Sequence, residues 1–313
     1  MLKRAGAGAL AALLLLGAAG AGSSTAQAAA PACFGAAERD PAHPCTNPAL
    51  SVFPALKDRL QLTASGCRQT HQEPGPICAF GTRRPHPRGT FALLGDSHAL
   101  HWRGPLASVG RAQRWRGLSV WSPLCLFSTA VKYQDGPLRD HCVRWNRDVL
   151  TWFAHHPEVS TVFISQAVFI SIVPPPGRTV LATKADGFRR AWAKLPGTVQ
   201  HVVVIRDVPG TANATFDCID RVLAAGRQRA GPACREDRRA VLPWDPAIAA
   251  ALRTRAKRVQ SIDMTHYFCD RLFCPPVIGG VLVHRDLNHM TIAYAGTLGP
   301  YLLRAVRRLS ASW

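Results

Sequence analysis

From Thr90 onward the chain alternates short apolar runs with amphipathic stretches, and this alternation limits its fold more than any other feature. Short apolar runs bounded by polar or Gly residues are typical of buried strands. We predict five such strands, over residues 91–94, 118–121, 159–165, 201–205 and 259–264. Strands separated by helices cannot pair as hairpins. The pattern therefore predicts an α/β fold, with a parallel sheet and helices on both of its faces.

The stretches between these runs have helical periodicity. They predict helices over about 98–112, 141–156, 186–195, 217–229 and 246–257. After the last strand, apolar residues recur at spacings of three and four from Thr291 to Leu309, which predicts one closing amphipathic helix.

Residues 1–30 have the pattern of a secretory signal peptide. Lys3 and Arg4 precede an apolar stretch over 5–22, and small residues follow over 23–30. An uncleaved anchor is the alternative, although so Gly- and Ala-rich a run would be a weak membrane span. We expect an exported protein, secreted or held in the extracytoplasmic cell envelope, with no transmembrane segment after cleavage.

Ten cysteines fit an exported chain better than a reducing cytosol. Four fall in a Pro- and Cys-rich stretch over 31–89: Cys33, Cys45, Cys67 and Cys78. We interpret this stretch as a disulfide-stapled extension ahead of a domain over 90–313. Pairing of neighbours would join the other six as Cys125–Cys142, Cys218–Cys234 and Cys269–Cys274. A zinc site is the alternative, but CxxC-type spacing is missing, so we expect no metal and no cofactor.

The chain is strongly basic, with 38 Lys and Arg against 19 Asp and Glu, a net charge of +19. Residues 221–258 alone hold ten basic and three acidic side chains. A nucleic-acid site would need a recognised module, which this chain lacks, and export argues against it. We expect either electrostatic attraction to an anionic envelope polymer or a merely solvated surface.

Ser97 is the candidate nucleophile. It lies in Gly95-Asp96-Ser97-His98-Ala99, between the first predicted strand and the first predicted helix. Ligands of open α/β sheets bind at the carboxyl ends of strands, and N–H groups at a helix start can stabilise an oxyanion. The alternative is that Asp96 or Ser97 merely caps the helix.

Asp286 and His289 are candidate partners for Ser97. They lie three residues apart in Asp286-Leu287-Asn288-His289, just before the closing helix. A serine hydroxyl needs a base to take its proton, and that base is usually a histidine oriented by a carboxylate. Within one turn, Asp286 can bind one ring nitrogen of His289 and leave the other facing Ser97.

These two segments resemble the SGNH (GDSL-like) hydrolases, specifically the SGNH domain found at the C-terminus of acyltransferase-3 proteins. The first block is similar to residues 95–99, and the last is similar to 286–290 followed by Ala295-Gly296. The stretches 122–125 and 268–274 are also similar to that subgroup. The resemblance covers about Thr90 to the C-terminus. It implies a flavodoxin-like three-layer α/β/α sandwich with about five parallel strands and a Ser97–His289–Asp286 triad. Because no membrane bundle is present, it also implies a freestanding version of the domain.

The chain departs from the wider superfamily at the oxyanion hole. The Gly and Asn that serve as donors there have no clear match. The Ser97 backbone N–H is one candidate donor, and the amide of Gln166, at the end of the third predicted strand, is another. His98 and His101 flank Ser97, and we expect them to pack or to face solvent.

The sequence therefore predicts an exported serine esterase or O-acyltransferase. It would act on O-acyl groups, acetyl above all, of a cell-envelope glycan through an acyl-Ser97 intermediate. The alternative is a disulfide-stabilised glycan-binding module that keeps the fold without efficient chemistry.

Overall fold

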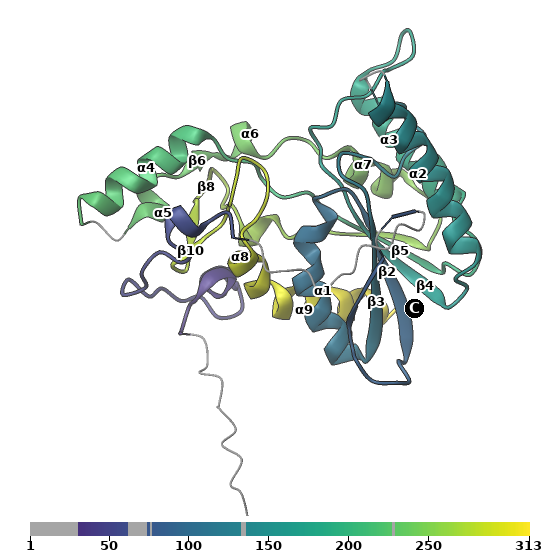
Figure 1. The fold of residues 1–313 in the computed structure, drawn as a ribbon. Coiled ribbons are helices and arrows are strands. Elements are labelled where there is room, and N and C mark those ends of the chain that lie inside the picture. The colour runs from purple at the N-terminus through teal and green to yellow at the C-terminus, as the bar shows by residue number, and fades with distance from the viewer. Residues whose placement is uncertain (1–30, 62–73, 76, 133–135, 227–228) are drawn as a thin grey trace, which may run out of the picture. The chain divides into compact units, whose positions relative to one another are not determined.

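Six strands form one mixed sheet in the order β1-β3-β2-β4-β5-β7 (Figure 1). The computed structural model describes residues 31–61, 74–75, 77–132, 136–226 and 229–313, and Ala32–Trp313 form one compact unit. The strands are β1 (Cys78–Gly81), β2 (Gly89–Gly95), β3 (Trp115–Trp121), β4 (Val159–Ser165), β5 (His201–Ile205) and β7 (Val259–Ile262).

The last five of these strands are parallel, and they coincide with the five predicted apolar runs. Numbered along the chain, they lie in the order 2-1-3-4-5, which is the flavodoxin-like order. β1 pairs antiparallel with β3 at the edge of the sheet. This strand was not predicted, because four residues in a Pro-rich stretch carry too little periodicity. β1 precedes residue 90, and the domain boundary near that residue remains a prediction.

Helices cover both faces of the sheet and complete the three-layer sandwich (Figure 1). The longer ones are α1 (Arg103–Gln113), α2 (Pro137–Ala154), α3 (Val180–Ala193), α4 (Asn213–Ala224), α7 (Pro246–Arg253) and α9 (Gly299–Ser310). The short ones are α5 (Ala230–Ala233), α6 (Arg238–Val241) and α8 (Ile292–Thr297). Four 3-10 turns accompany them: η1 (Gly35–Arg39), η2 (Leu56–Asp58), η3 (Ala99–Trp102) and η4 (Thr265–Tyr267).

The alternation along β2 shows how the core divides between the two faces. Ala92 and Leu94 pack with the buried side chains of α2, α3 and α7, whereas Phe91 and Leu93 pack with those of α1 and α9. Successive strand residues point to opposite faces, and all four are fully buried. A strand buried on both sides has a continuous apolar sequence, which is why these runs were recognisable.

The prediction of a single closing helix over 291–309 is wrong in one respect. The structure has two helices there, α8 and α9, which meet at Leu298. Pro300 lies in the first turn of α9. Proline has no backbone N–H to continue the hydrogen-bond ladder of α8, and it is favoured in the first turn of a new helix.

Residues 31–61 pack against the hairpin of β9 (Val277–Ile278) and β10 (Val281–Leu282). Phe53 accepts a hydrogen bond from Leu282 and donates one to Gly280. Gly279 and Gly280 both have positive φ, which suits the tight two-residue turn between the strands. The two-residue strands β6 (Glu236–Asp237) and β8 (Phe273–Cys274) pair antiparallel and form a separate small sheet.

Four disulfides have both of their cysteines among the described residues: Cys33–Cys45, Cys125–Cys142, Cys218–Cys234 and Cys269–Cys274. The three nearest-neighbour pairs predicted after residue 90 are therefore confirmed. Cys78 is also disulfide-bonded, and Cys67 lies outside the described residues. Several disulfides fit an oxidising, extracytoplasmic compartment. Among the described helices, none is long and apolar enough to cross a membrane. The predicted signal peptide over 1–30 lies outside the described residues.

Candidate active site

Ser97 lies in the turn that joins β2 to η3 and α1, at the carboxyl edge of the sheet. Gly95, the last residue of β2, has φ +152°, and a Cβ there would clash with the carbonyl oxygen of Ser165 at the end of β4. Only glycine fits so close an approach of two strand ends. The predicted helix over 98–112 begins as the 3-10 turn η3 and continues as α1.

Asp96 joins this turn to the end of β4. Its Oδ1 accepts the backbone N–H of His98 at 2.8 Å, and its Oδ2 accepts the N–H of Ala167 at 3.0 Å. The side chain is fully buried. Burial raises the pKa of Asp96 to about 6, against the opposing effects of the charge on His98 and of these two hydrogen bonds. Asp96, rather than Ser97, therefore holds the turn.

Asp286 and His289 lie in a loop that closes on itself before α8. Arg285 donates its backbone N–H to the carbonyl of His289 at 2.9 Å. Asp286 Oδ1 accepts the N–H groups of Asn288 and His289 at 3.1 and 2.9 Å. The loop is tied to the connection after β5, because Thr211 donates its N–H to Leu287 at 2.8 Å. These bonds fix both side chains relative to the sheet edge.

The structure brings the three predicted residues together. His289 Nε2 lies 2.9 Å from Ser97 Oγ, and His289 Nδ1 lies 2.9 and 3.0 Å from the two carboxylate oxygens of Asp286. Burial acts to raise the pKa of Asp286, but the hydrogen bonds from His289 and Asn288 outweigh it and hold that pKa well below its ordinary value. Asp286 is thus a carboxylate positioned to orient the ring. The His289 side chain is 19% exposed, so the site is open to solvent.

A buried ion pair lies next to Ser97 and is formed by His98 and Asp207. His98 Nδ1 lies 2.6 Å from Asp207 Oδ1, with both side chains at most 3% exposed. Burial acts to lower the pKa of His98, but the charge and hydrogen bond of Asp207 raise it overall. Asp207 Oδ2 also accepts the N–H of Val168 at 2.9 Å. Asp96 and Asp207 therefore fix two consecutive residues, Ala167 and Val168, of the loop that follows β4.

Asp245, the N-cap residue of α7, fixes the backbone of Asp207. Its Oδ2 accepts the N–H of Asp207 at 2.9 Å, and its Oδ1 caps α7 by accepting the N–H groups of Ala247 and Ile248. Neither Asp207 nor Asp245 was predicted from the sequence. The only signal for Asp207 was its place just past a predicted strand, at the edge where polar groups of such sheets gather.

His101 is buried in η3 beside these groups. Neither of its ring nitrogens has a hydrogen-bond partner among the described residues. Burial, reinforced by the neighbouring positive charges, holds its pKa well below the ordinary value. An unpartnered buried polar group costs about 1–3 kcal/mol, so this ring is an unusual element of a core. Of the two expectations for His98 and His101, packing is the correct one for both.

Gln166 lies at the carboxyl end of β4, next to the end of β2. Its Oε1 accepts the backbone N–H of Phe127, whereas its Nε2 is buried without a partner among the described residues. The Ser97 backbone N–H likewise has no acceptor in the described part of the chain. Both of the predicted oxyanion donors are therefore uncommitted. Their role remains a prediction, because nothing in the site marks where an oxyanion would lie.

A second serine–histidine pair lies near the end of β3. Ser122 Oγ lies 2.8 Å from His141 Nε2, the same kind of contact that Ser97 makes with His289. Among the described residues, however, no carboxylate binds the other ring nitrogen of His141. This pair therefore lacks the group that orients a catalytic histidine, and it provides a comparison for the first pair.

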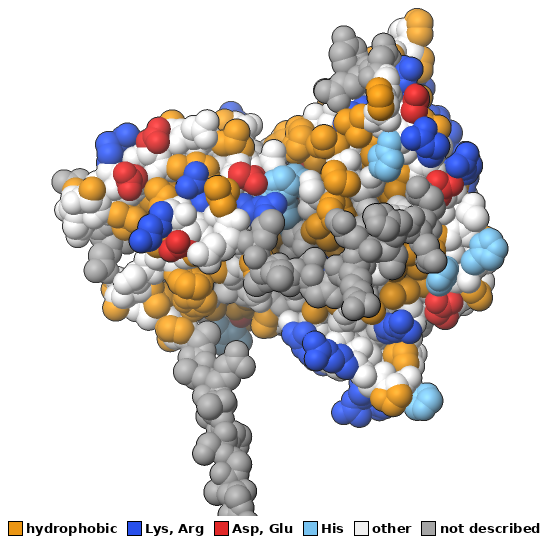
Figure 2. Space-filling view, viewed as in Figure 1, with side chains coloured by type: hydrophobic (Ala, Val, Ile, Leu, Met, Phe, Trp, Pro, Cys, Tyr) orange, Lys and Arg blue, Asp and Glu red, His pale blue; other side chains and the backbone are white. Residues whose placement is uncertain are grey.

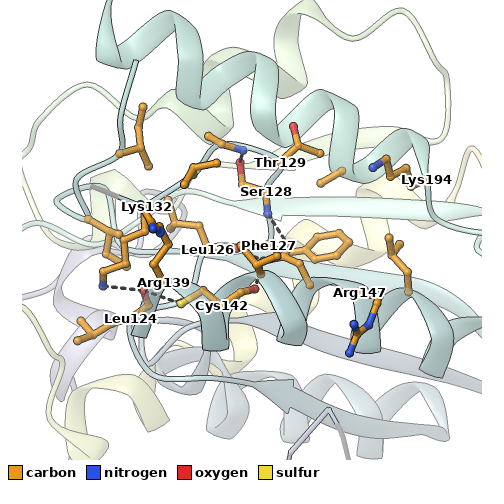
Figure 3. Close-up of a pocket in the computed structure, with 18 residues that line it drawn as sticks. Leu124, Leu126, Phe127, Ser128, Thr129, Lys132, Arg139, Cys142, Arg147 and Lys194 are labelled. Atoms are coloured by element: carbon orange, nitrogen blue, oxygen red, sulfur yellow. Dashed lines mark hydrogen bonds between the residues drawn. The ribbon is translucent and has the colours of Figure 1, made fainter. Parts of the chain in front are cut away.

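A cavity of about 370 Å³ lies between the 124–132 loop, α2 and α3 (Figure 3). Its wall is mainly apolar, with Lys132, Arg139, Arg147 and Lys194 around it. None of Ser97, Asp286 and His289 lines it. Phe127, whose backbone N–H binds Gln166, is part of its wall, so the cavity borders a neighbour of Gln166 and not the three predicted catalytic residues.

On the face shown in Figure 2, Lys and Arg side chains in the region of α4 and α6 are interspersed with Asp and Glu side chains rather than gathered in one patch. The expected contact with an anionic polymer therefore remains a prediction.

Residues 66–304 match the family model for the SGNH domain that is fused to AT3 domains. The chain belongs to this family. Among solved structures, the chain is similar to the periplasmic domain of the lipopolysaccharide acetyltransferase of Salmonella ser. Paratyphi A. The two share 12% identity at a TM-score of 0.53, over 72% of this chain and 85% of that one, which shows a common fold. None of the curated proteins matches the chain in sequence.

The loop that carries Asp286 and His289 is anchored by His284, and this anchor should depend on pH. His284 donates from Nε2 to the carbonyl of Pro209 at 2.7 Å. Burial lowers its pKa to about 4. A histidine whose folded pKa is depressed adds stability above its unfolded pKa of about 6.5, and that stability is lost as pH falls through the folded value.

We predict that His284→Leu destabilises the protein more at pH 7 than at pH 4, by up to about 3 kcal/mol. Asp96 has a raised pKa and acts in the opposite direction over the same range. Asp96 is present in both proteins, so its contribution cancels in the difference between their free energies of unfolding. Denaturant unfolding of variant and wild type at pH 7 and pH 4 measures this difference. An equal difference at the two pH values would contradict the role given to His284.

Proposed function

We propose that this chain is a serine-dependent acyl-transferring enzyme that removes or transfers an O-acyl group, acetyl above all, on a cell-envelope glycan. The observation that carries the proposal is His289, which binds Ser97 through one ring nitrogen and Asp286 through the other. One shared partner gives the serine a base and gives the base an orienting carboxylate.

In this mechanism His289 Nε2 takes the proton of Ser97 as Oγ attacks the carbonyl carbon of the O-acyl group. The sugar oxygen leaves with that proton, and the acyl group stays on Ser97 as an ester. A water or a second hydroxyl, deprotonated by His289, then attacks the acyl-serine and restores Oγ–H. Water makes the reaction a hydrolysis, and a sugar hydroxyl makes it a transfer. Asp286 stays ionised throughout and stabilises the imidazolium.

The oxyanion of each tetrahedral intermediate needs donors near Ser97 Oγ. We assign the Ser97 N–H and the Gln166 amide to this role. Their support is that both are uncommitted donors and that they follow β2 and β4, whose ends lie side by side. The buried carboxylates of Asp96 and Asp207 fix the residues around both donors, so little reorganisation is needed during reaction.

The glycan substrate and the extracytoplasmic location are also part of the proposal. The family is named for domains fused to AT3 domains, and the similar Salmonella structure is that of a lipopolysaccharide acetyltransferase periplasmic domain. The disulfides and the predicted signal peptide agree with export. We expect residues 221–258 to add weak, salt-sensitive attraction to anionic envelope polymers.

The alternative of a non-catalytic glycan-binding module rests on the missing superfamily Gly and Asn. The triad geometry weighs against it, since a binding role gives no reason for a serine, a histidine and a carboxylate to be aligned in this order. Turnover of an aryl acetate by the purified, oxidised protein separates the two functions.

We predict that Ser97→Ala abolishes covalent labelling by a serine-directed phosphonate and removes aryl acetate turnover. His289→Ala and Asp286→Asn should each lower the turnover rate by about 10²-fold or more, because the first removes the base and the second can stabilise the wrong tautomer. Combining them should cost little more than the larger single effect, because the residues act as a unit.

Ser122→Ala is the matched control, since Ser122 also contacts a histidine at 2.8 Å. Mass mapping of the label should find Ser97 in this variant as in wild type. A label that persists in Ser97→Ala and disappears in Ser122→Ala would show that the wrong serine was chosen.

Gln166→Glu tests the oxyanion donor. The substitution keeps an oxygen for the Phe127 N–H but replaces the unpartnered NH₂ group with an acceptor. We predict a fall in kcat of about 10²–10³-fold with a much smaller change in KM, because the amide would bind charge that develops only in the transition state. Steady-state kinetics with an aryl acetate measures both, and an unchanged kcat would remove Gln166 from the mechanism.

A further inference from the structure

Three imidazole rings surround the space beside Ser97. His98 and His101 come from the turn after β2 and from η3, and His289 comes from the loop before α8. One nitrogen from each ring lies within 4.8 Å of the other two. The ring centroids are 4.7 to 5.2 Å apart.

The nitrogens that face this space are short of partners. Both nitrogens of His101 and Nε2 of His98 are buried without a hydrogen bond of normal geometry in the described part of the chain, although the Asn288 side chain lies near His98. His289 Nε2 binds only the Ser97 hydroxyl there. Packing accounts for the burial of the His98 and His101 rings but not for their unpartnered nitrogens, and the proposed triad uses His289 alone.

Two of the rings, His98 and His289, each have a carboxylate bound to the nitrogen that faces away from this space. His98 Nδ1 binds Asp207 at 2.6 Å, and His289 Nδ1 binds Asp286 at 2.9 Å. A carboxylate on the far nitrogen fixes the ring and makes the near nitrogen a better ligand, which is the usual arrangement around zinc. In both rings that leaves Nε2 as the ligand atom.

We propose that His98, His101 and His289 form a binding site for a borderline divalent transition-metal ion, with Zn²⁺ as the best fit. Three imidazole ligands and one open position suit tetrahedral zinc, and Ser97 Oγ or a water would take the fourth position. Zn–N bonds of about 2.0–2.1 Å require ligand nitrogens about 3.3 Å apart, so the rings close inward by roughly 1 Å on binding.

The charges around the site favour a cation on balance. Asp96, Asp207 and Asp286 lie next to the three histidines, while Arg285 supplies an opposing positive charge. Asp207 and Asn288 favour a proton on His98, and zinc has to displace the proton at Nε2. The bond to Asp207 survives this, because Nδ1 keeps its own proton.

Bound zinc would inhibit the serine chemistry, and this consequence rests on the proposed function. The lone pair of His289 Nε2 cannot hold both zinc and the Ser97 proton. Binding therefore removes the base from Ser97, and removal of the metal restores it. The site would couple the enzyme to the zinc level of its compartment.

Zinc binding is tested first, without reference to activity. The oxidised protein, whose cysteines in the described residues are not free thiols, is dialysed against Zn²⁺ and its metal content is measured. We expect about one tightly held Zn²⁺ per chain in the wild type and none in His101→Leu or His101→Gln. His155→Leu, which removes an exposed histidine, is the control and should bind zinc as the wild type does. Mg²⁺, which prefers oxygen ligands, should not compete. Equal zinc content in wild type and both His101 variants would overturn the site.

Inhibition is tested by phosphonate labelling of Ser97, with each protein compared with its own metal-free rate. Zn²⁺ should slow labelling of wild type by about 10²-fold, reversibly with a chelator, and should not slow labelling of the His101 variants, whose labelling also shows that they are folded. Equal slowing in wild type and variants would contradict the coupling. Absence of labelling in metal-free wild type would contradict the proposed function instead, and would leave the measured zinc content as evidence for or against the site.

Discussion

The rest of the site depends on the hydrogen bonds that the Asp96 carboxylate accepts. This carboxylate is buried at the carboxyl edge of the sheet and binds backbone N–H groups from both sides, His98 after β2 and Ala167 after β4. The two strand ends are so close that only glycine fits at residue 95. These hydrogen bonds fix the turn after β2 and with it the position of Ser97. Asp207 repeats the arrangement one strand farther on, where it joins His98 to Val168.

These buried acids explain how a loop-built site can be rigid. The turn after β2, the loop after β4 and the connection after β5 all have backbone groups that need partners once the edge is covered. Asp96, Asp207 and Asp245 provide them, and the Asp286 loop is tied to the same edge through Thr211 and His284. Ser97 and His289, 192 residues apart in the chain, are thereby held at 2.9 Å.

The sequence was sufficient for the parts of the fold and site that depend on local pattern. The five parallel strands are continuous apolar runs, and Asp286 and His289 meet within one turn, so both could be predicted. β1 was missed because four residues among prolines have no usable period. The sequence predicts one closing helix because the apolar spacing continues across Leu298, whereas Pro300 starts a new helix just after that residue. His98 and Asp207 could not be paired, because 109 residues separate them and only the sheet order brings them together.

The central claim is that Ser97 carries the acyl group during the reaction. It is tested most directly by quenching the protein with acid during turnover of an acetyl donor and locating any acetyl group by peptide mass spectrometry. The account predicts an acetyl ester on Ser97 that disappears when the donor is exhausted and is absent from Ser97→Ala. An acetyl ester on Ser122, or steady turnover with no acyl-serine in any peptide, would contradict it.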